Sequence, residues 1–201
     1  MITKLAEKAA NVLCSNDNLE QDDRELYIYG FIMLFSKAFY FLLTALLGLM
    51  FGIVLESIVF YIMFSVIRGY AGGVHASTER ACMISTSLSL LTCTAAMKVC
   101  IVYSLFVLPI IMLALSTISI IALSPLDTKE KRLSEEEKKV YRRKTHLFTT
   151  IILLVAVLSL SSKYAPMFYP CVFSLLLEGV LLLIGKNINP IASWQNKNAE
   201  A

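Results

Sequence analysis

Long apolar runs separated by short polar breaks form the hydrophobic pattern of this chain. Such runs indicate membrane-spanning helices, since a span needs roughly 20 apolar residues and shorter ones are tolerated. The six candidate spans are residues 30–50, 51–67, 82–97, 101–123, 147–161 and 167–184. Several of them are short, so the pattern predicts six spans and leaves open the alternative of four spans with re-entrant segments.

The first residues show a different, amphipathic pattern. Their apolar face consists of Ile2, Leu5, Ala6, Ala9, Val12 and Leu13, and their polar face of Thr3, Lys4, Glu7, Lys8 and Asn11. This spacing predicts a helix that lies in the membrane interface, or alternatively one that packs on the cytoplasmic loops. The polar and acidic residues 15–25 should connect this helix to the first span.

Composition also indicates a membrane protein, because hydrophobic residues make up 57% of the chain. No internal repeat, low-complexity tract or linker divides the sequence, and no cleavable signal peptide is recognisable at its start. The sequence therefore predicts an all-α polytopic membrane protein with about six transmembrane helices and an N-terminal interfacial helix. A single domain is expected over residues 1–201.

The distribution of lysine and arginine predicts the orientation of the spans. With six spans and the amino terminus inside, the outer segments hold only Lys98 and Lys163. The inner segments hold Lys4, Lys8, Arg24, Arg68, Arg80, the basic residues between 129 and 144, Lys186 and Lys197. Both termini are therefore expected in the cytoplasm. The net charge of +3, gathered on that face, indicates anionic lipid or an acidic partner and argues against nucleic acid.

Metal and cofactor sites are not indicated. The five cysteines show neither the paired spacing of metal sites nor a secreted-type disulfide framework. With only two histidines in the chain, a zinc site is not expected either. We interpret three of the cysteines as small apolar residues that fill helix interfaces, namely Cys93, Cys100 and Cys171.

Two ionisable residues interrupt the spans, Lys37 in the first and Glu178 in the last. Charges inside a bilayer are costly and usually face a partner or the interior of a helix bundle. Their estimated depths are similar, so one interpretation is that the two side chains pair. The other interpretation is that Lys37 reaches the interface and Glu178 is partly hydrated.

A stripe of small, mildly polar side chains runs along the third span. Its members recur three and four residues apart and are Cys82, Thr86, Ser89, Cys93 and Ala96. Small residues let transmembrane helices approach closely, so close helix packing is one interpretation. A groove for an extended peptide, with Thr86 and Ser89 as supporting residues, is the other.

The longest polar segment, residues 125–146, carries a capping-box signature in which Ser134 precedes Glu137 by three residues. A helix should therefore start there and run to the fifth span. Its basic residues are Lys138, Lys139, Arg142, Arg143 and Lys144. Such a run commonly serves as a topology signal. The alternative is capture of substrate or lipid, with Lys138 and Arg142 as candidate contacts.

The candidate chemistry lies in the polar break between the second and third spans, where His75 precedes Cys82 by seven residues. A thiol and an imidazole can act as a nucleophile and its base. On a straight helix the two would be about 10 Å apart, at a rise of roughly 1.5 Å per residue, so a dyad requires a bend between them. Gly69, Gly72 and Gly73 provide backbone freedom just upstream.

The position of Cys82 also favours reactivity. A cysteine at the start of a helix gains thiolate character from the helix dipole, and Arg68 and Arg80 would add positive potential. Candidates for orienting the imidazole are Ser77, Thr78 and Glu79. Backbone N–H groups near the nucleophile are candidate oxyanion donors. The non-catalytic alternative is a glycine-containing turn with a hydrogen-bonded histidine.

Two segments carry a family resemblance. The first consists of Arg68, Gly72, Gly73, His75 and Ala76, followed by Cys82, and the second is Ser124-Pro-Leu-Asp-Thr-Lys129. The first resembles the signature of the AgrB family, accessory gene regulator membrane endopeptidases of Gram-positive bacteria. The second is similar to that family's proline–aspartate–basic segment and adds Asp127 and Lys129 as supporting residues. Position 133 is a leucine in this chain, whereas the family pattern has a proline there. This difference affects the expected conformation of the loop and not the expected chemistry. Length and hydropathy profile extend the resemblance to the whole chain.

The resemblance implies a function as well as a fold. AgrB proteins process an AgrD-type precursor into a cyclic autoinducing peptide for quorum sensing, with a cysteine nucleophile and a histidine base that match Cys82 and His75. Cys82 would remove the acidic tail and hold the peptide as a thioester until an internal side chain closes the ring. A homodimer is a further family expectation. The alternative is a non-enzymatic peptide exporter, which would need Lys37, Glu178 and the polar third span but not Cys82.

Overall fold

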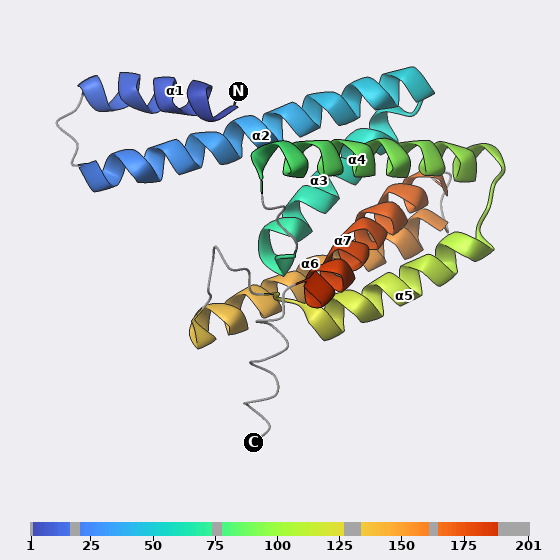
Figure 1. The fold of residues 1–201 in the computed structure, drawn as a ribbon. Helices are drawn as coiled ribbons and strands as arrows, with labels where there is room; N and C mark the ends of the chain where they lie inside the picture. Colours follow the sequence, from blue (N-terminus) through green and yellow to red (C-terminus); the bar gives the residue numbers. More distant parts are fainter. Residues whose placement is uncertain (1, 17–20, 74–77, 127–133, 161–164, 189–201) are drawn as a thin grey trace. The chain divides into compact units, whose positions relative to one another are not determined.

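The computed structural model describes the chain except for residues 1, 17–20, 74–77, 127–133, 161–164 and 189–201. Its described part consists of seven α-helices and one short 3-10 helix, without a strand (Figure 1). These elements are α1 (Ile2–Asn16), α2 (Gln21–Phe51), α3 (Val54–Ala71), α4 (Glu79–Val102), α5 (Val107–Leu123), α6 (Glu135–Leu160), η1 (Ala165–Met167) and α7 (Phe168–Ile188). The all-α prediction is therefore confirmed.

Helix length and composition identify the candidate spans. α2, α3, α4, α6 and α7 each contain a stretch long and apolar enough to cross a membrane. α5 is also apolar but has 17 residues, which is the lower end of the usual length range of a span. The structure thus confirms a polytopic membrane protein, and with α5 the described helices match the six predicted spans.

The junction between the third and fourth spans differs from the prediction. α4 continues through Val102, so the predicted span 101–123 is interrupted near its start. Ser104 has a φ of +48°, and the N–H of Leu105 donates to the carbonyl oxygen of Cys100 at 3.0 Å. This is a Schellman motif, in which a left-handed residue turns the chain out of the helix.

α2 starts earlier and ends later than the predicted first span. Its first residue is Gln21, which lies inside the predicted connector 15–25. At its other end Gly52 has a φ of +68°, and the N–H of Ile53 donates to the carbonyl oxygen of Gly48 at 2.8 Å. This end is also a Schellman motif, formed here around a glycine, which adopts positive φ readily.

The chain divides into two compact units, residues 1–43 and 44–201. In the first unit α1 lies beside the beginning of α2, where Nε of Arg24 donates to Oδ1 of Asn11 at 3.0 Å (Figure 1). Ala6 and Ala10 of α1 are buried, whereas Leu5 is exposed. The predicted N-terminal helix is therefore confirmed, and its exposed apolar side chains suit the membrane interface. That interfacial position stays a prediction.

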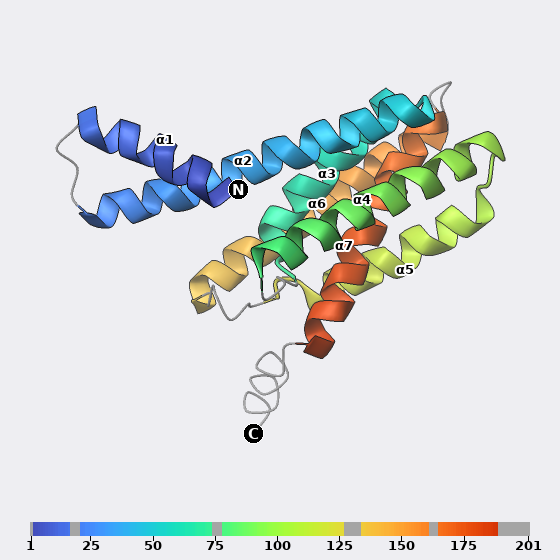
Figure 2. The same cartoon turned by 45° about the horizontal axis from the view of Figure 1, so that its top comes forward.

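α7 is the central helix of the second unit and packs against α3, α4, α5 and α6 (Figure 2). In its most apolar stretch 72% of the residues are buried. A Cβ atom on Gly179 would lie 3.2 Å from the Cα of Ser116, so α5 and α7 approach closely at this glycine. The inward side of α7 is therefore a place where a charged side chain can be shielded from lipid.

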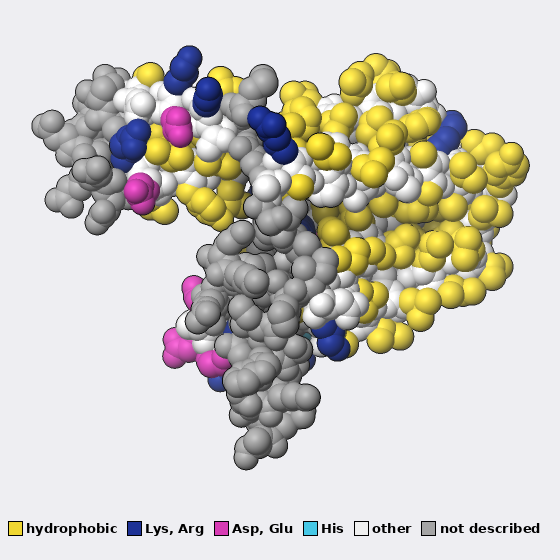
Figure 3. All heavy atoms as spheres, viewed as in Figure 1, with side chains coloured by type: hydrophobic (Ala, Val, Ile, Leu, Met, Phe, Trp, Pro, Cys, Tyr) yellow, Lys and Arg dark blue, Asp and Glu magenta, His cyan; other side chains and the backbone are white. Residues whose placement is uncertain are grey.

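The outward faces of the second unit are apolar. Figure 3 shows hydrophobic side chains over much of its visible surface. Leu88 of α4, Ile118 of α5 and Leu154 of α6 are all more than half exposed. Apolar surface of this extent is unusual on a soluble monomer and is the surface that lipid tails cover in a membrane protein.

Candidate functional site

Cys82 lies in the first turn of α4, as the sequence predicts. The turn is capped by Thr78, whose side-chain oxygen accepts a hydrogen bond from the N–H of Ala81 at 3.2 Å. The N–H of Cys82 donates to the carbonyl oxygen of Thr78 at 3.0 Å, which is the first hydrogen bond of the helix. The positive end of the helix dipole therefore lies at the turn that contains Cys82. The Cys82 side chain is half-buried.

His75 and Cys82 do not share one helix, because α3 ends at Ala71 and α4 begins at Glu79. A straight helix between the two residues, which would keep them apart, is therefore excluded. His75 itself lies outside the described residues, as do Ser77, Asp127 and Lys129. Glu79 is the first residue of α4, and its side chain lies outside the description. The pairing of His75 with Cys82 stays a prediction.

The glycines of the predicted motif form a turn directly after α3. Gly72 has a φ of +78° and Gly73 a φ of +125°, which are left-handed values that side chains other than hydrogen rarely allow. A Cβ atom on Gly72 would lie closer than 3.0 Å to the carbonyl oxygen of Leu126. The N–H of Leu126 donates to the carbonyl oxygen of Ala71 at 3.0 Å. The fold thus brings together the two sequence segments that carry the family resemblance.

Arg68 turns toward α7 and toward its own glycine turn. Its Nη1 donates to the carbonyl oxygen of Gly72 at 2.7 Å and lies 3.7 Å from Oε1 of Glu178. The predicted effect of the Arg68 charge on Cys82 stays a prediction. A carboxylate beside the guanidinium offsets much of that positive potential.

One predicted environment of Glu178, partial hydration, differs from the structure, because its side chain is 0% exposed and its Oε1 lies 3.7 Å from Nη1 of Arg68. The predicted pairing of Glu178 with Lys37 stays a prediction. The sequence carried only a weak signal for the pair of Arg68 and Glu178: one arginine at the end of the second span and one carboxylate within the last. Lys37 belongs to the first unit.

The small-residue stripe of α4 lies beside the packed face of the helix. Thr86, Ser89 and Cys93 are half-buried. The fully packed face is formed by Leu90, Thr94, Met97 and Cys100. Ser89 donates to the carbonyl oxygen of Ser85 at 2.8 Å, so its hydroxyl is satisfied within its own helix. Close packing is therefore provided by a neighbouring set of residues, and the groove interpretation of the stripe stays a prediction.

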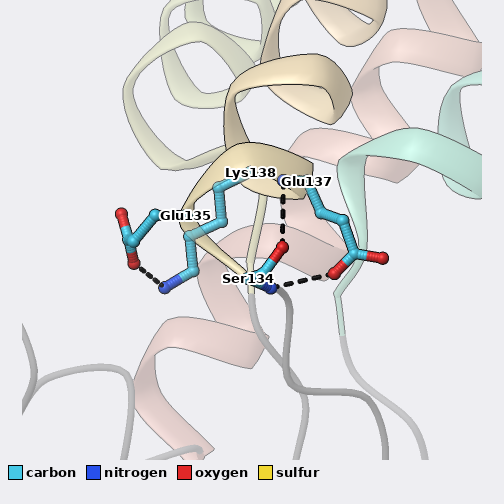
Figure 4. A network of polar contacts seen from close by, with 4 residues as sticks. All are labelled: Ser134, Glu135, Glu137 and Lys138. Carbon is cyan, nitrogen blue, oxygen red and sulfur yellow. Dashed lines mark hydrogen bonds and ion pairs between the residues drawn. The ribbon is translucent and has the colours of Figure 1, made fainter.

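The predicted capping box at the start of α6 is confirmed. The N–H of Ser134 donates to Oε2 of Glu137 at 2.9 Å, and the N–H of Glu137 donates to Oγ of Ser134 at 3.3 Å (Figure 4). Lys138 pairs with Glu135 at 2.9 Å. One of the two candidate basic contacts is thus partly neutralised, whereas the other, Arg142, is exposed.

An aromatic cluster joins α6 to the end of α3, and the sequence reasoning missed it. Tyr70 stacks on Phe148 with ring centroids 5.4 Å apart and also contacts Tyr141 at 5.8 Å. Nζ of Lys144 lies 5.1 Å from the centroid of the Tyr70 ring, a cation–π distance. The aromatic spacing on α6 was a usable signal, since residues 141 and 148 are two turns apart on one helical face.

The described residues contain no group of three or more histidine, cysteine or acidic side chains that could hold a metal ion. Three of the features described above lie in or next to polar breaks of the chain: a capped helix start with a cysteine, a glycine turn and a basic helix. The fourth is an ion pair that joins Arg68, beside the glycine turn, to Glu178 inside α7.

Comparison with known proteins places the chain in a family. The model of the family "Accessory gene regulator B" matches residues 6–182. A "Putative AgrB-like protein 2" of Clostridium perfringens strain 13 is 26% identical over 170 residues, covering 82% of this chain and 79% of that protein. "Protein FsrB" of Enterococcus faecalis is 23% identical over 161 residues, covering 80% of this chain and 65% of that protein. No solved structure matches. Because the family model covers most of the sequence, the chain belongs to the AgrB family of accessory gene regulator proteins.

Proposed function

We propose that this protein is a membrane cysteine endopeptidase that removes the acidic C-terminal tail of an AgrD-type precursor and promotes cyclisation of the remaining peptide. Membership of the AgrB family supports involvement in accessory gene regulator peptide processing. The observation that carries the finer proposal is the position of Cys82 in the capped first turn of a membrane-spanning helix. Such a position favours a thiolate at the edge of the bilayer.

In the first step the thiol proton of Cys82 passes to His75, and the resulting thiolate attacks the carbonyl carbon of the scissile peptide bond and forms a carbon–sulfur bond. The tetrahedral intermediate then collapses, the carbon–nitrogen bond breaks, and the tail leaves with its new amino group protonated by His75. The peptide is held on Cys82 as a thioester. Covalent catalysis of this kind divides one difficult transfer into two easier ones.

In the second step an internal nucleophile of the peptide, a cysteine in most members of this family, attacks the thioester carbonyl. Its proton passes to His75, the ring closes, and Cys82 is released. Exchange of one thioester for another is nearly isoenergetic, so the activated acyl group survives for ring closure. Water must be excluded during this interval, and the apolar surroundings of α4 and α7 favour that exclusion.

The basic surface of α6 suits the acidic tail of the precursor. Lys139, Arg142 and Arg143 are exposed, whereas Lys138 pairs with Glu135 and Lys144 lies over the ring of Tyr70. We therefore assign tail binding to the first three residues. Charge contacts of this kind act on encounter and orientation more than on the chemical step.

The same charges define the orientation in the membrane. Lysine and arginine gather in the segments that we assign to the cytoplasm. Both termini, Cys82 and the start of α6 then lie on the cytoplasmic side, beside anionic lipid headgroups. A homodimer remains part of the proposal through family membership alone.

The exporter alternative depends on charged groups along a path through the membrane. Glu178, one of its expected groups, is 0% exposed and paired with Arg68, so its side chain does not line an open path. This observation favours the peptidase.

Replacement of Cys82 tests the proposal. The full-length protein in lipid vesicles is mixed with a synthetic AgrD-type peptide that has an amphipathic start, a ring-forming cysteine and an acidic tail. Cys82→Ala should abolish cleavage, and a precursor whose ring-forming cysteine is replaced by alanine should leave wild-type protein as a hydroxylamine-labile adduct at Cys82, detected by mass spectrometry. Cleavage at the wild-type rate by Cys82→Ala would exclude the mechanism.

A further inference from the structure

Glu178 is a buried charge in the central helix of the second unit. Both of its carboxylate oxygens are buried and accept no hydrogen bond from the described residues, and its side chain is 0% exposed. An ionisable group in this position within a membrane span is costly, and its presence usually reflects a function. The pair with Arg68, at 3.7 Å, is the compensation that the structure shows.

Stability alone does not account for such a pair. The desolvation of two buried charges can cost as much free energy as their attraction provides, and apolar residues of similar volume often stabilise a protein equally well. The geometry of Arg68 shows what an apolar replacement would lose. Its Nη1 also donates to the carbonyl oxygen of Gly72 at 2.7 Å, so the guanidinium joins α7 to the backbone that follows α3.

The glycine turn is shaped around this guanidinium. Gly73 has a φ of +125°, which L side chains rarely adopt, and a Cβ atom there would lie closer than 3.0 Å to Nη1 of Arg68, so another residue would strain the turn and displace the guanidinium. On its other side the turn is held by Leu126, whose N–H donates to the carbonyl oxygen of Ala71. Arg68 and Leu126 thus fix the chain at Gly72 and Gly73, two residues before His75 in the sequence.

We propose that Glu178 is a positioning residue of the peptide-processing site. It orients the guanidinium of Arg68, which holds the carbonyl group of Gly72 and thereby sets the direction in which the chain continues toward His75. This inference rests on the proposed function, in which His75 is the general base. Glu178 therefore affects the rate of acyl transfer and not the binding of the precursor.

The first test is Glu178→Gln, which keeps shape and removes the charge. The rate of acyl-enzyme formation is measured in lipid vesicles with the synthetic AgrD-type peptide at several concentrations. At saturating peptide the rate should fall roughly 10²-fold, the size expected when a catalytic group is misplaced by about 1 Å. The peptide concentration that gives half the maximal rate should stay unchanged, and hydrogen exchange at Gly72 and Gly73 should become faster. Glu56→Gln is the matched control, because Glu56 lies in the first turn of α3, at the opposite end from Arg68, and this change should leave all three measurements as in wild type.

The second test is the double variant Arg68→Met/Glu178→Gln, which removes both charges and restores neutrality. It should fold as wild type, because no charge is left unpaired, and it should still process slowly, because Gly72 has lost its donor. If this variant processes the peptide at the wild-type rate, Arg68 and Glu178 only neutralise each other's charge, and the proposal is wrong. A folded Glu178→Gln protein with the wild-type saturating rate would overturn it as well.

The proposed function and the role of Glu178 can be disproved separately. If Cys82→Ala, measured in parallel, processes the peptide, the proposed function is wrong. If Cys82→Ala is inactive and Glu178→Gln is as fast as wild type, the function stands and only the role of Glu178 is wrong. If Glu178→Gln does not fold, the neutral double variant decides between positioning and charge compensation.

Discussion

The N–H of Leu126 donates a 3.0 Å hydrogen bond to the carbonyl oxygen of Ala71. This bond joins the end of α3 to the segment that follows α5, and Gly72 and Leu126 pair there as an isolated parallel bridge. Because Ala71 and Leu126 are buried, their backbone groups must find partners within the protein. The bridge provides them and places the glycine turn beside the Ser124–Leu126 segment.

Gly72→Ala should slow processing and destabilise the turn. The added Cβ would collide with the carbonyl oxygen of Leu126, and φ of +78° is strained for alanine, which together cost about 1–3 kcal/mol. Gly69→Ala is the matched control, since a Cβ there meets nothing within 4 Å and Gly69 lies inside α3. The control should raise stability by up to about 1 kcal/mol and leave processing unchanged. Thermal unfolding in detergent and the cleavage rate measure both effects, and equal rates for the two variants would contradict the assigned role of the turn.

His75→Ala should leave the Cys82 thiol in place and slow acyl-enzyme formation by roughly 10²–10⁴-fold, the usual contribution of general acid–base catalysis.

Simultaneous replacement of the other four cysteines by alanine should leave processing largely intact, because their positions provide no base or capped helix start; these are Cys14, Cys93, Cys100 and Cys171. Single-turnover kinetics measure this variant and His75→Ala. Loss of the adduct in the four-cysteine variant, with normal folding, would move the nucleophile away from Cys82.

Neutralising the exposed basic residues of α6 should weaken binding of the precursor. In the variant with Lys139, Arg142 and Arg143 changed to glutamine, affinity should fall most at low salt, because such contacts are screened over roughly 10 Å at 0.1 M. Lys138→Gln alone should have little effect, since Lys138 is already paired with Glu135. Lys186→Gln, at an exposed lysine of α7, is the control for loss of positive charge. Titration of the peptide at several salt concentrations tests this, and unchanged affinity of the triple variant would leave the basic run as a topology signal only.

Single cysteines should reveal the orientation in the membrane. In a background without native cysteines, Glu136→Cys at the start of α6 should be protected from an impermeant thiol reagent in intact cells. Ser104→Cys, in the junction between α4 and α5, should be labelled. Both residues are exposed, so accessibility differs between them through the membrane alone. The reverse labelling pattern would move Cys82 to the outer face.

Local features of this protein follow from its sequence. The start of α6 is an example: Ser134 and Glu137 are three residues apart, and each satisfies a backbone N–H group of the other, so the pattern contains the whole interaction. The apolar runs likewise predict the helices, because a membrane-spanning helix needs roughly 20 consecutive apolar residues. The cap of α4 is equally local, since Thr78 lies directly before the helix, although Thr78 was predicted only as an orienter of the imidazole.

The tertiary structure decided what depends on distant partners. Glu178 and Arg68 lie on separate helices, and no periodicity within either helix relates them; their pairing follows from the packing of α3 against α7. The boundary at Ser104 was hidden for a similar reason, because a serine in left-handed conformation has no signature in a continuous apolar run. The sequence alone therefore determined the helices, the capping box of α6 and the residue types of the site. The burial of Glu178 and the contacts of the glycine turn came only from the fold, since they require backbone and side-chain groups that the sequence keeps far apart.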